Sequence, residues 1–331
     1  MLFRGKILFL LLLLFGSELR SQENPVFEVN AVKYLLGTEI EIKALTPSIE
    51  AGKYSLYIAF REIERIDSLL SWSIPTSEIS KINLNSGKVA VKVSEEVFDL
   101  LSRAIAYCKE FDGYFDITIG PLTQLWGFSS DEIVMEPPSE TSIQELLPIV
   151  NYKLLVLDST NRTAFLQKKG MAIDLGGIGK GYAIDRAAAK LRSEGTENFI
   201  INAGGDIFTS GNKVNGENWR VGVKHPREED ELFAIIETTN EAVVTSGDYE
   251  RYFIFEGVRY HHLLNPRTGY PVSKNMSVTV ISKTAEEADV YSTALFISAS
   301  LNENEKLIKF DCLIIDSEGK YLATPKYLIN R

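Results

Sequence analysis

The stretch IDLGGIGKGY occupies residues 173–182 and holds four glycines within six positions. A helical pattern of apolar residues follows it through Ile184, Ala188 and Leu191. Glycines let a backbone approach a ligand closely, and the first turn of a helix offers unpaired amides to phosphate groups. We therefore expect a phosphate-binding turn between a strand and a helix, although a plain tight turn would give the same pattern.

Two familiar nucleotide-binding motifs are excluded by single positions in this stretch. Asp174 stands where a Walker A loop needs glycine, and Gly181 replaces the Ser or Thr that follows the lysine of that loop. Tyr182 takes the place of the third glycine of the dinucleotide-binding fingerprint. A phosphate-bearing ligand must therefore be recognised by another arrangement.

Downstream of this helix, short runs of β-branched and aromatic residues alternate with Gly, Asn and Asp, which is typical of an antiparallel sheet. The runs are residues 199–202, 219–223, 232–236, 252–255 and 277–281. Upstream, residues 32–44 alternate around Leu36-Gly37-Thr38 and predict a strand or hairpin. We interpret Asn202-Ala203-Gly204-Gly205-Asp206 as a hairpin turn.

Three further helices are indicated by apolar spacing and by their ends. Apolar residues recur at three and four positions from Leu56 to Leu70, and again from Val97 to Cys108. The third helix begins at Thr284, where Glu287 is placed to complete a capping box. Helices and strands that come in blocks predict an α+β fold. Cys108 lies on the apolar stripe, so we expect a buried thiol rather than a disulfide with Cys312.

The composition is that of an ordinary globular protein. The chain has 331 residues, of which 45% are hydrophobic and 24% charged, with a formal net charge of −10. An acidic chain without basic tracts argues against nucleic acid and anionic lipid as partners. No linker interrupts the chain, so residues 22–331 are expected to form one unit after a signal peptide at residues 1–21.

The N-terminus has the layout of a secretory signal peptide. Arg4 and Lys6 precede an unbroken apolar run over residues 7–15, and small residues follow. Cleavage after Ser17 and cleavage after Ser21 both fit. The chain is thus expected to be exported to the periplasm or cell envelope. No cysteine lies nearby, so a lipoprotein anchor is not supported.

Two polar pairs in the second half are candidates for a site. Asp289 and Thr293 are four positions apart and project from one helix face, and such oxygen ligands suit Mg²⁺. The same pattern would arise if Asp289 only stabilised the end of the helix and Thr293 only packed against its neighbours. His261 and His262 are neighbours on a strand, so they point to opposite faces and only one is expected to face a site.

Taken together, eight blocks in one order resemble the ApbE family, the FAD:protein FMN transferases. The blocks are Leu36-Gly37-Thr38; Leu70-Ser71-Trp72 with Ser77-Glu78-Ile79; residues 113–122 with 125–128; residues 174–185; Gly204-Gly205-Asp206; residues 245–249; residues 262–271; and residues 289–293. The resemblance implies an α+β fold related to the tunnelling fold, with FAD in a cleft between two lobes.

The resemblance also implies roles for individual residues. Mg²⁺, or Mn²⁺ in its place, would be held by Asp289, Thr293 and the backbone carbonyl of Gly177. The flavin nucleotide would be lined by Leu36, Trp72, Tyr114, Phe115, Asp116, Asp174 and Lys180, with His262 near the reacting phosphates. His262, Asp174 and Lys180 are therefore the candidate catalytic residues. His262, Asp116, Asp174 and Asp248 are all candidates for the general base.

The implied reaction is the transfer of FMN from FAD to a Thr or Ser hydroxyl of an exported or membrane-bound flavoprotein subunit, with release of AMP. Association with a membrane would come through that acceptor. The same site with water as nucleophile would be a metal-dependent FAD pyrophosphatase, and a site without turnover would be a flavin-storage protein. The family's usual aromatic residue near Trp72 is missing, which leaves the balance between transfer and hydrolysis open. Asn265 replaces the family's usual Asp beside His262, which removes one charge that could have raised the pKa of the histidine.

Overall fold

The structure is a computed structural model that describes residues 26–128, 136–228, 230–299, 310–325 and 328–329. The expected signal peptide and both of its cleavage sites lie outside these residues. Within the described part, no helix combines the length and apolar character needed to span a bilayer.

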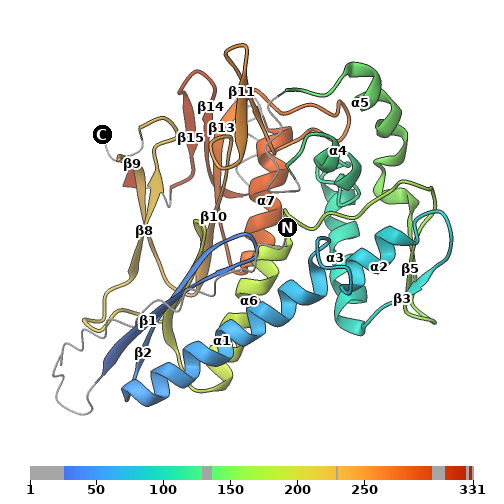
Figure 1. Cartoon of the computed structure of the whole chain (residues 1–331). Helices are drawn as coiled ribbons and strands as arrows, with labels where there is room; N and C mark the ends of the chain where they lie inside the picture. Colours follow the sequence, from blue (N-terminus) through green and yellow to red (C-terminus); the bar gives the residue numbers. More distant parts are fainter. Residues whose placement is uncertain (1–25, 129–135, 229, 300–309, 326–327, 330–331) are drawn as a thin grey trace, which may run out of the picture.

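An eight-stranded sheet forms the centre of the molecule, and every pair of neighbouring strands in it is antiparallel (Figure 1). Its spatial order is β1 (Phe27–Leu35), β2 (Thr38–Thr46), β6 (Asn198–Ala203), β7 (Asp206–Ser210), β10 (Glu241–Gly247), β13 (Asn275–Ser282), β14 (Asp311–Asp316) and β15 (Tyr321–Ala323). The hairpin expected around Leu36 is confirmed as β1–β2, and the turn expected at 202–206 joins β6 to β7.

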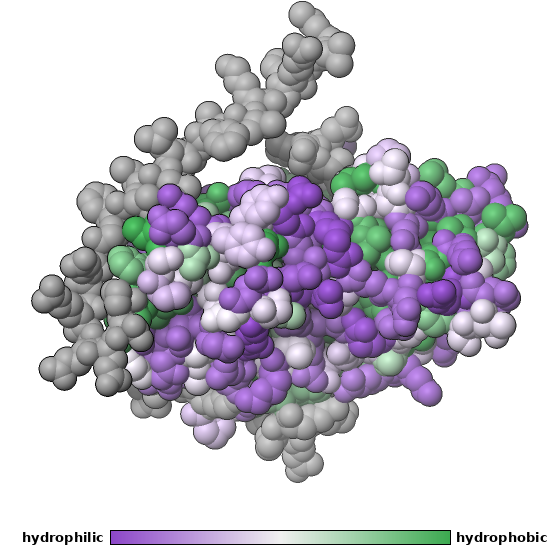
Figure 2. Space-filling model, turned by 90° about the horizontal axis from the view of Figure 1, so that it is seen from below, coloured by the Kyte–Doolittle hydropathy of each residue, from purple (hydrophilic) through white to green (hydrophobic). Residues whose placement is uncertain are grey.

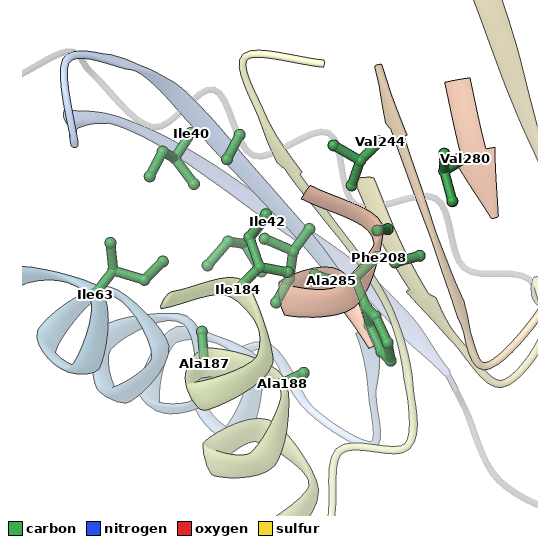
Figure 3. Packing of buried hydrophobic residues seen from close by; sticks show 14 of the residues in the cluster. Ile40, Ile42, Ile63, Ile184, Ala187, Ala188, Phe208, Val244, Val280 and Ala285 are labelled. Carbon is green, nitrogen blue, oxygen red and sulfur yellow. The ribbon is translucent and has the colours of Figure 1, made fainter. Parts of the chain in front are cut away.

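Three helices cover one face of this sheet, namely α1 (Ile49–Leu70), α6 (Gly179–Ser193) and α7 (Ala285–Ser298). Figure 3 shows Ile42 of β2, Ile184 of α6 and Ala285 of α7 meeting in the core between them. Alternate residues of β2 point inward as its sequence predicts, because successive strand side chains face opposite sides. Each fully buried Ile contributes about 1.5–3 kcal/mol through the hydrophobic effect.

A second sheet lies on the other face. It consists of β16 (Leu328–Ile329), β9 (Leu232–Thr238) and β8 (Trp219–Lys224) in that order. Val221 and Ile236 of this sheet pack against Val243 and Leu313 of the central sheet. The strands predicted at 219–223 and 232–236 are thus confirmed, and they close the second side of the central sheet.

The remaining elements form a second, mainly helical lobe, seen on the right of Figure 1. They are α2 (Glu78–Leu84), α3 (Glu95–Glu110), α4 (Gly120–Leu125), α5 (Glu140–Leu146), the 3₁₀ turns η1 (Leu147–Ile149) and η2 (Tyr152–Leu154), and a small sheet of β3 (Val91–Lys92), β5 (Thr163–Leu166) and β4 (Leu155–Asp158). A ribbon of β11 (Tyr252–Phe255) and β12 (Val258–His261) packs on Trp126 beside it. The expected α+β class is confirmed.

The two lobes meet along α6 and α7. Tyr182 of α6 and Val290 of α7 share an apolar cluster with Leu100 and Cys108 of α3. The thiol of Cys108 is buried and free, as the sequence predicts. Because both central helices contact both lobes, residues on them are well placed to form a site between the lobes.

Helices α6 and α7 approach each other more closely than any side chain at Gly181 would permit. A Cβ at this position would lie 2.2 Å from the carbonyl oxygen of Ala285. The carboxylate of Asp185 accepts the amide hydrogens of Ala285 and Glu286 at 2.8 and 2.9 Å, so a residue of α6 caps the start of α7. The relative position of the two helices is therefore fixed at the ends that carry the site.

The capping box predicted for α7 forms only in part. Thr284 accepts the amide hydrogen of Glu287 at 3.2 Å, as expected. The carboxylate of Glu287, however, accepts a hydrogen bond from the Ser282 hydroxyl instead of reaching back to the cap. Asp185 supplies the further capping, and this contact comes from 100 residues away in the sequence.

The face of the molecule in Figure 2 is mostly hydrophilic, with hydrophobic residues in smaller groups toward its two sides. This distribution agrees with a chain that carries a formal charge of −10.

Candidate active site

The glycine-rich turn leads into α6, but the prediction of a strand directly before the turn is wrong. Residues 173–178 are irregular, and only an isolated bridge joins Ala172 to Ile119. The side chain of Asn83 both accepts from and donates to the backbone of Ile173, at 2.7 and 2.9 Å, and so replaces a neighbouring strand. Side-chain bonding of this kind leaves no sequence periodicity, which is why the pattern suggested a strand.

The turn itself is held by Asp174 and opens on the N-terminus of α6. Asp174 accepts the amide hydrogen of Gly176 at 2.8 Å through its carboxylate, and its own amide bonds to the carbonyl of Ile117 at 2.8 Å. Ile178, the N-cap of α6, makes no side-chain capping bond. The amides of Gly179 and Gly181 are already bonded, to the carbonyl of Leu175 and the carboxylate of Asp289. Among the described residues the amide of Lys180 has no such partner, so it is the first-turn amide suited to an anion.

Gly177 lies directly beside a proposed metal ligand. A Cβ on Gly177 would be 3.3 Å from Thr293 Oγ1 and 3.1 Å from the ring of Phe115. The glycine therefore lets the turn pack closely against α7 and the buried Phe115, where a side chain would be crowded. The structure brings together Gly177 and Thr293, which are over a hundred residues apart in the sequence.

Asp289 lies on the same side of α7 and is almost fully buried, with 3% of its surface exposed. Its Oδ2 accepts the amide hydrogen of Gly181 at 3.0 Å. Burial raises the pKa of Asp289 to about 7, against the opposing charge of Lys180, and the negative charge of Asp206 adds to the rise. A carboxylate so desolvated is poised to gain from a nearby cation.

Lys180 forms an ion pair with Asp206, whose side chain is only 2% exposed. Burial lowers the pKa of Lys180, but the charges of Asp206 and Asp289 outweigh it and raise that pKa above its ordinary value. The sequence assigned Asp206 only to a hairpin turn, so its pairing was missed. The available signal for this pairing was the Gly204-Gly205 pair before Asp206, because a tight glycine turn can bring the next side chain into contact with a neighbouring element.

The two histidines behave differently, as expected from their alternation. His261 is 3% exposed and its Nε2 bonds to the carbonyl of Val272 at 2.7 Å, which is a structural contact. His262 is partly buried, and its Nδ1 makes a long contact of 3.4 Å with the carbonyl of Arg251. Burial, together with the charges of His261, Arg251 and Lys180, lowers the pKa of His262 to about 3. The ring is therefore neutral near pH 7.

The other candidate bases are engaged by neighbouring groups. The carboxylate of Asp116 accepts three hydrogen bonds, from the amide and hydroxyl of Thr118 and from the amide of Tyr152. Asp248 receives two hydrogen bonds from Arg227 and one from Arg259. Asp174 holds the turn through Gly176. These bonds leave His262 as the candidate with a neutral ring nitrogen available.

The residues expected to line the flavin surround the junction of the lobes. Leu36, at φ 54° in the β1–β2 turn, packs on the apolar clusters of both lobes. Trp72 and Phe115 pack on the cluster of the helical lobe. The guanidinium of Arg267 lies 3.9 Å from the centre of the Tyr114 ring. Contact of these side chains with a flavin stays a prediction.

A cavity of about 360 Å³ lies beside this group and not over the metal candidates. Asp116, Tyr152 and Arg267 line it, together with Gly113. Gly177, Asp289 and Thr293 are absent from its lining. The candidate site is therefore defined by the hydrogen bonds and close contacts at α6 and α7, not by this cavity.

The side chains of α7 offer few ligand atoms for a divalent cation. Among the described residues, no three His, Cys, Asp or Glu side chains gather in a group that could hold a metal. Asp289 and Thr293 instead offer one carboxylate and one hydroxyl, and the hydroxyl lies beside Gly177. Oxygen ligands in small number fit Mg²⁺ or Mn²⁺ when phosphates and water complete the shell.

Comparison with known proteins gives one consistent family. The model of the ApbE family matches residues 36–312. The FAD:protein FMN transferase of Klebsiella pneumoniae (strain 342) is 36% identical over 278 residues, which are 83% of this chain and 83% of that protein. The enzyme of the same name from Vibrio cholerae is 30% identical over 290 residues, 87% of this chain and 85% of that protein.

Solved structures agree with this assignment. The ApbE protein of Thermotoga maritima superposes with a TM-score of 0.84 at 36% identity, covering 90% of this chain and 97% of that one. The flavin transferase ApbE of Vibrio cholerae gives 0.82 at 27% identity, covering 91% and 98%. The resemblance inferred from the eight sequence blocks is confirmed, and this chain belongs to the ApbE family.

Proposed function

We propose that this chain transfers FMN from FAD to a Thr or Ser hydroxyl of an acceptor flavoprotein and releases AMP. The names of its relatives support the transfer of FMN from FAD to a protein. The observation that carries the proposal for this chain is the meeting of Gly177, Asp289 and Thr293 at the N-terminus of α6. This arrangement suits a pyrophosphate between a helix end and oxygen ligands.

Each group at the site then has a definite task. The amide and the ammonium of Lys180 bind phosphate oxygens, and Asp206 keeps that ammonium in place. Mg²⁺ or Mn²⁺, held by Asp289, Thr293 and the carbonyl of Gly177, would offset the charge of the pyrophosphate and make AMP a better leaving group.

His262 is the proposed general base. If Nδ1 carries the hydrogen that faces the Arg251 carbonyl, Nε2 is left as a proton acceptor. The acceptor hydroxyl would lose its proton to Nε2 while its oxygen bonds to the FMN-side phosphorus. The bond from that phosphorus to the AMP oxygen breaks in the same step, so atoms and charge balance. A general base held within hydrogen-bond reach of the reacting proton typically contributes about 10²–10⁴-fold to a rate.

The nucleophile distinguishes this proposal from its alternatives. The protein is incubated with FAD, Mg²⁺ and an exported flavoprotein subunit, and the products are followed by mass spectrometry and chromatography. Transfer should give AMP together with an acceptor heavier by one covalently bound FMN, and a Thr or Ser to Ala change at the acceptor's target should stop that gain. A pyrophosphatase would give AMP and free FMN at one rate with or without acceptor. A storage protein would release neither.

The proposed site of action is outside the cytoplasm. We propose export with removal of residues 1–21, because Arg4 and Lys6 precede the apolar run at 7–15. An acceptor that is exported or membrane-bound would then be met in the cell envelope. N-terminal sequencing of the protein recovered from that fraction should start after Ser17 or Ser21. Recovery of chains that keep Met1, in the cytoplasm alone, would contradict export.

Metal binding should weaken as the pH falls through neutrality. Burial is the main cause that raises the pKa of Asp289 to about 7. Below that pH a proton therefore competes with the cation for the carboxylate. The dissociation constant for Mn²⁺ should rise by up to about tenfold for each pH unit below 7 and level off above 8. Electron paramagnetic resonance titrations at pH 6, 7 and 8 measure this. Equal affinity at pH 6 and pH 8 would remove Asp289 from the ligand set.

A further inference from the structure

A chain of hydroxyl groups runs from Thr293 into the protein interior. Thr293 Oγ1 lies 3.3 Å from Ser246 Oγ, which lies 2.9 Å from Ser292 Oγ. Ser292 in turn donates to the backbone carbonyl of Asp289 at 3.0 Å. The chain therefore begins at one proposed metal ligand and ends on the backbone of the other.

The end of this chain decides the direction of every bond in it. A carbonyl oxygen only accepts, and each hydroxyl has a single hydrogen to donate. Because Ser292 gives its hydrogen to Asp289, Ser246 must donate to Ser292. Ser246 then has no hydrogen left for Thr293, so Thr293 must donate to Ser246.

This direction has a consequence for the oxygen of Thr293. Its hydrogen points toward Ser246, so the lone pairs of Oγ1 are left for groups other than Ser246, on an oxygen that lies beside Gly177. A hydroxyl that binds a cation must present lone pairs, because a hydrogen turned toward the cation would be repelled. The interior hydroxyls thus prepare Thr293 to act as a ligand.

Burial keeps this arrangement from being exchanged with water. Ser292 has no exposed surface and Ser246 has 9%. A buried hydroxyl that lost its partner would leave a polar group unsatisfied, which is costly. Two serines at such positions are therefore better explained by a directed bond than by packing alone.

We propose that Ser246 and Ser292 are positioning residues that orient the Thr293 hydroxyl toward a divalent cation. The inference rests on the proposed function only in that a cation binds at Asp289 and Thr293. Outer groups that orient a ligand typically account for about 10–100-fold in metal affinity.

The test is Mn²⁺ binding to the full-length protein, measured by electron paramagnetic resonance without FAD. Ser246→Ala should weaken binding by about tenfold, and Ser246→Thr, which keeps a hydroxyl, should restore most of it. In a Thr293→Ala background, Ser246→Ala should have no further effect, because its action passes through Thr293. A merely structural serine would weaken binding equally in both backgrounds, which would overturn the proposal.

Thr245→Val is the matched control. Thr245 is the neighbour of Ser246 on β10, and its hydroxyl bonds to that of Thr279 at 2.9 Å. The variant loses a comparable hydroxyl pair from the same strand and should keep wild-type affinity for Mn²⁺. If Ser246→Ala fails to fold in thermal melts, Ser246→Cys is used, and the same loss is expected because a thiol is a weak acceptor.

The outcomes separate this inference from the proposed function. Wild-type protein that binds no Mn²⁺ would overturn the metal part of the function and this inference with it. If Ser246→Ala binds Mn²⁺ as tightly as the wild-type protein does, the inference alone is overturned and the proposed function stands.

Discussion

Turnover of FAD in the Asp289→Ala variant is expected to fall on the order of 10³-fold while the protein stays folded. Asp289 is the only charged group in the proposed ligand set, and stabilisation of transition-state charge by a cation amounts to several kcal/mol. Removing a carboxylate whose pKa burial already raises to about 7 should cost little folding stability. Initial rates over a Mg²⁺ titration, with thermal melts alongside, measure both effects.

Two further variants sharpen this result. Asp289→Asn keeps an oxygen that can accept the Gly181 amide hydrogen, so it removes the charge without removing that contact. Thr293→Ala should be milder, since one neutral oxygen is lost. Glu287→Gln serves as the control, because it removes a charge from the same helix at a residue that bonds to Ser282. Wild-type rates in Asp289→Ala at low Mg²⁺ would rule out the assignment.

A loss of about 10²–10⁴-fold in FMN transfer is expected for His262→Gln. Burial, with the nearby positive charges, lowers the pKa of His262 to about 3, so its ring is neutral throughout the physiological range and a ring nitrogen can accept the hydrogen of the attacking hydroxyl. Glutamine fills a similar volume and still hydrogen-bonds, but it cannot act as a base. Affinity for FAD should therefore change little, and the loss should appear in kcat.

The pH dependence of stability in the same variant gives an independent measure of the lowered pKa of His262. Since the folded-state pKa lies below the usual value of 6.5, the unfolded chain binds the proton more readily. The wild-type melting temperature should therefore fall more than that of His262→Gln as the pH is lowered from 7 to 5. Equal falls in both proteins, or an unchanged kcat in the variant, would exclude His262 as a buried neutral base.

Local patterns predicted most of the elements near the site. The apolar spacing of α1 and α3 and the alternation of β2 arise from one buried face each, so they are visible in the sequence. The contacts that build the site are not local. Asn83 replaces a strand partner for Ile173, and Asp206 at the start of β7 pairs with Lys180 of α6. Neither contact has a periodicity.

The roles of individual site residues came from the family resemblance more than from spacing. Asp289 and Thr293 alone also fit a helix-end carboxylate with a packing threonine. What distinguishes them in the structure is the proximity of Gly177 to Thr293 and the bond from Gly181 to Asp289. Ser246 gave no signal of its own, because its importance depends on a hydroxyl of α7 that only the fold brings near.

The bond between Gly181 and Asp289 joins residues 108 positions apart, and the capping of α7 by Asp185 spans a similar distance. A ribosome therefore completes the N-terminal end of α6 long before Asp289 has been made. If the proposed site is right, neither the nucleotide nor the cation can act as a template for the early chain, because the proposed joint binding surface forms only after α7 has docked. A chain cut short before residue 285 should accordingly bind neither of them at the strength of the whole protein.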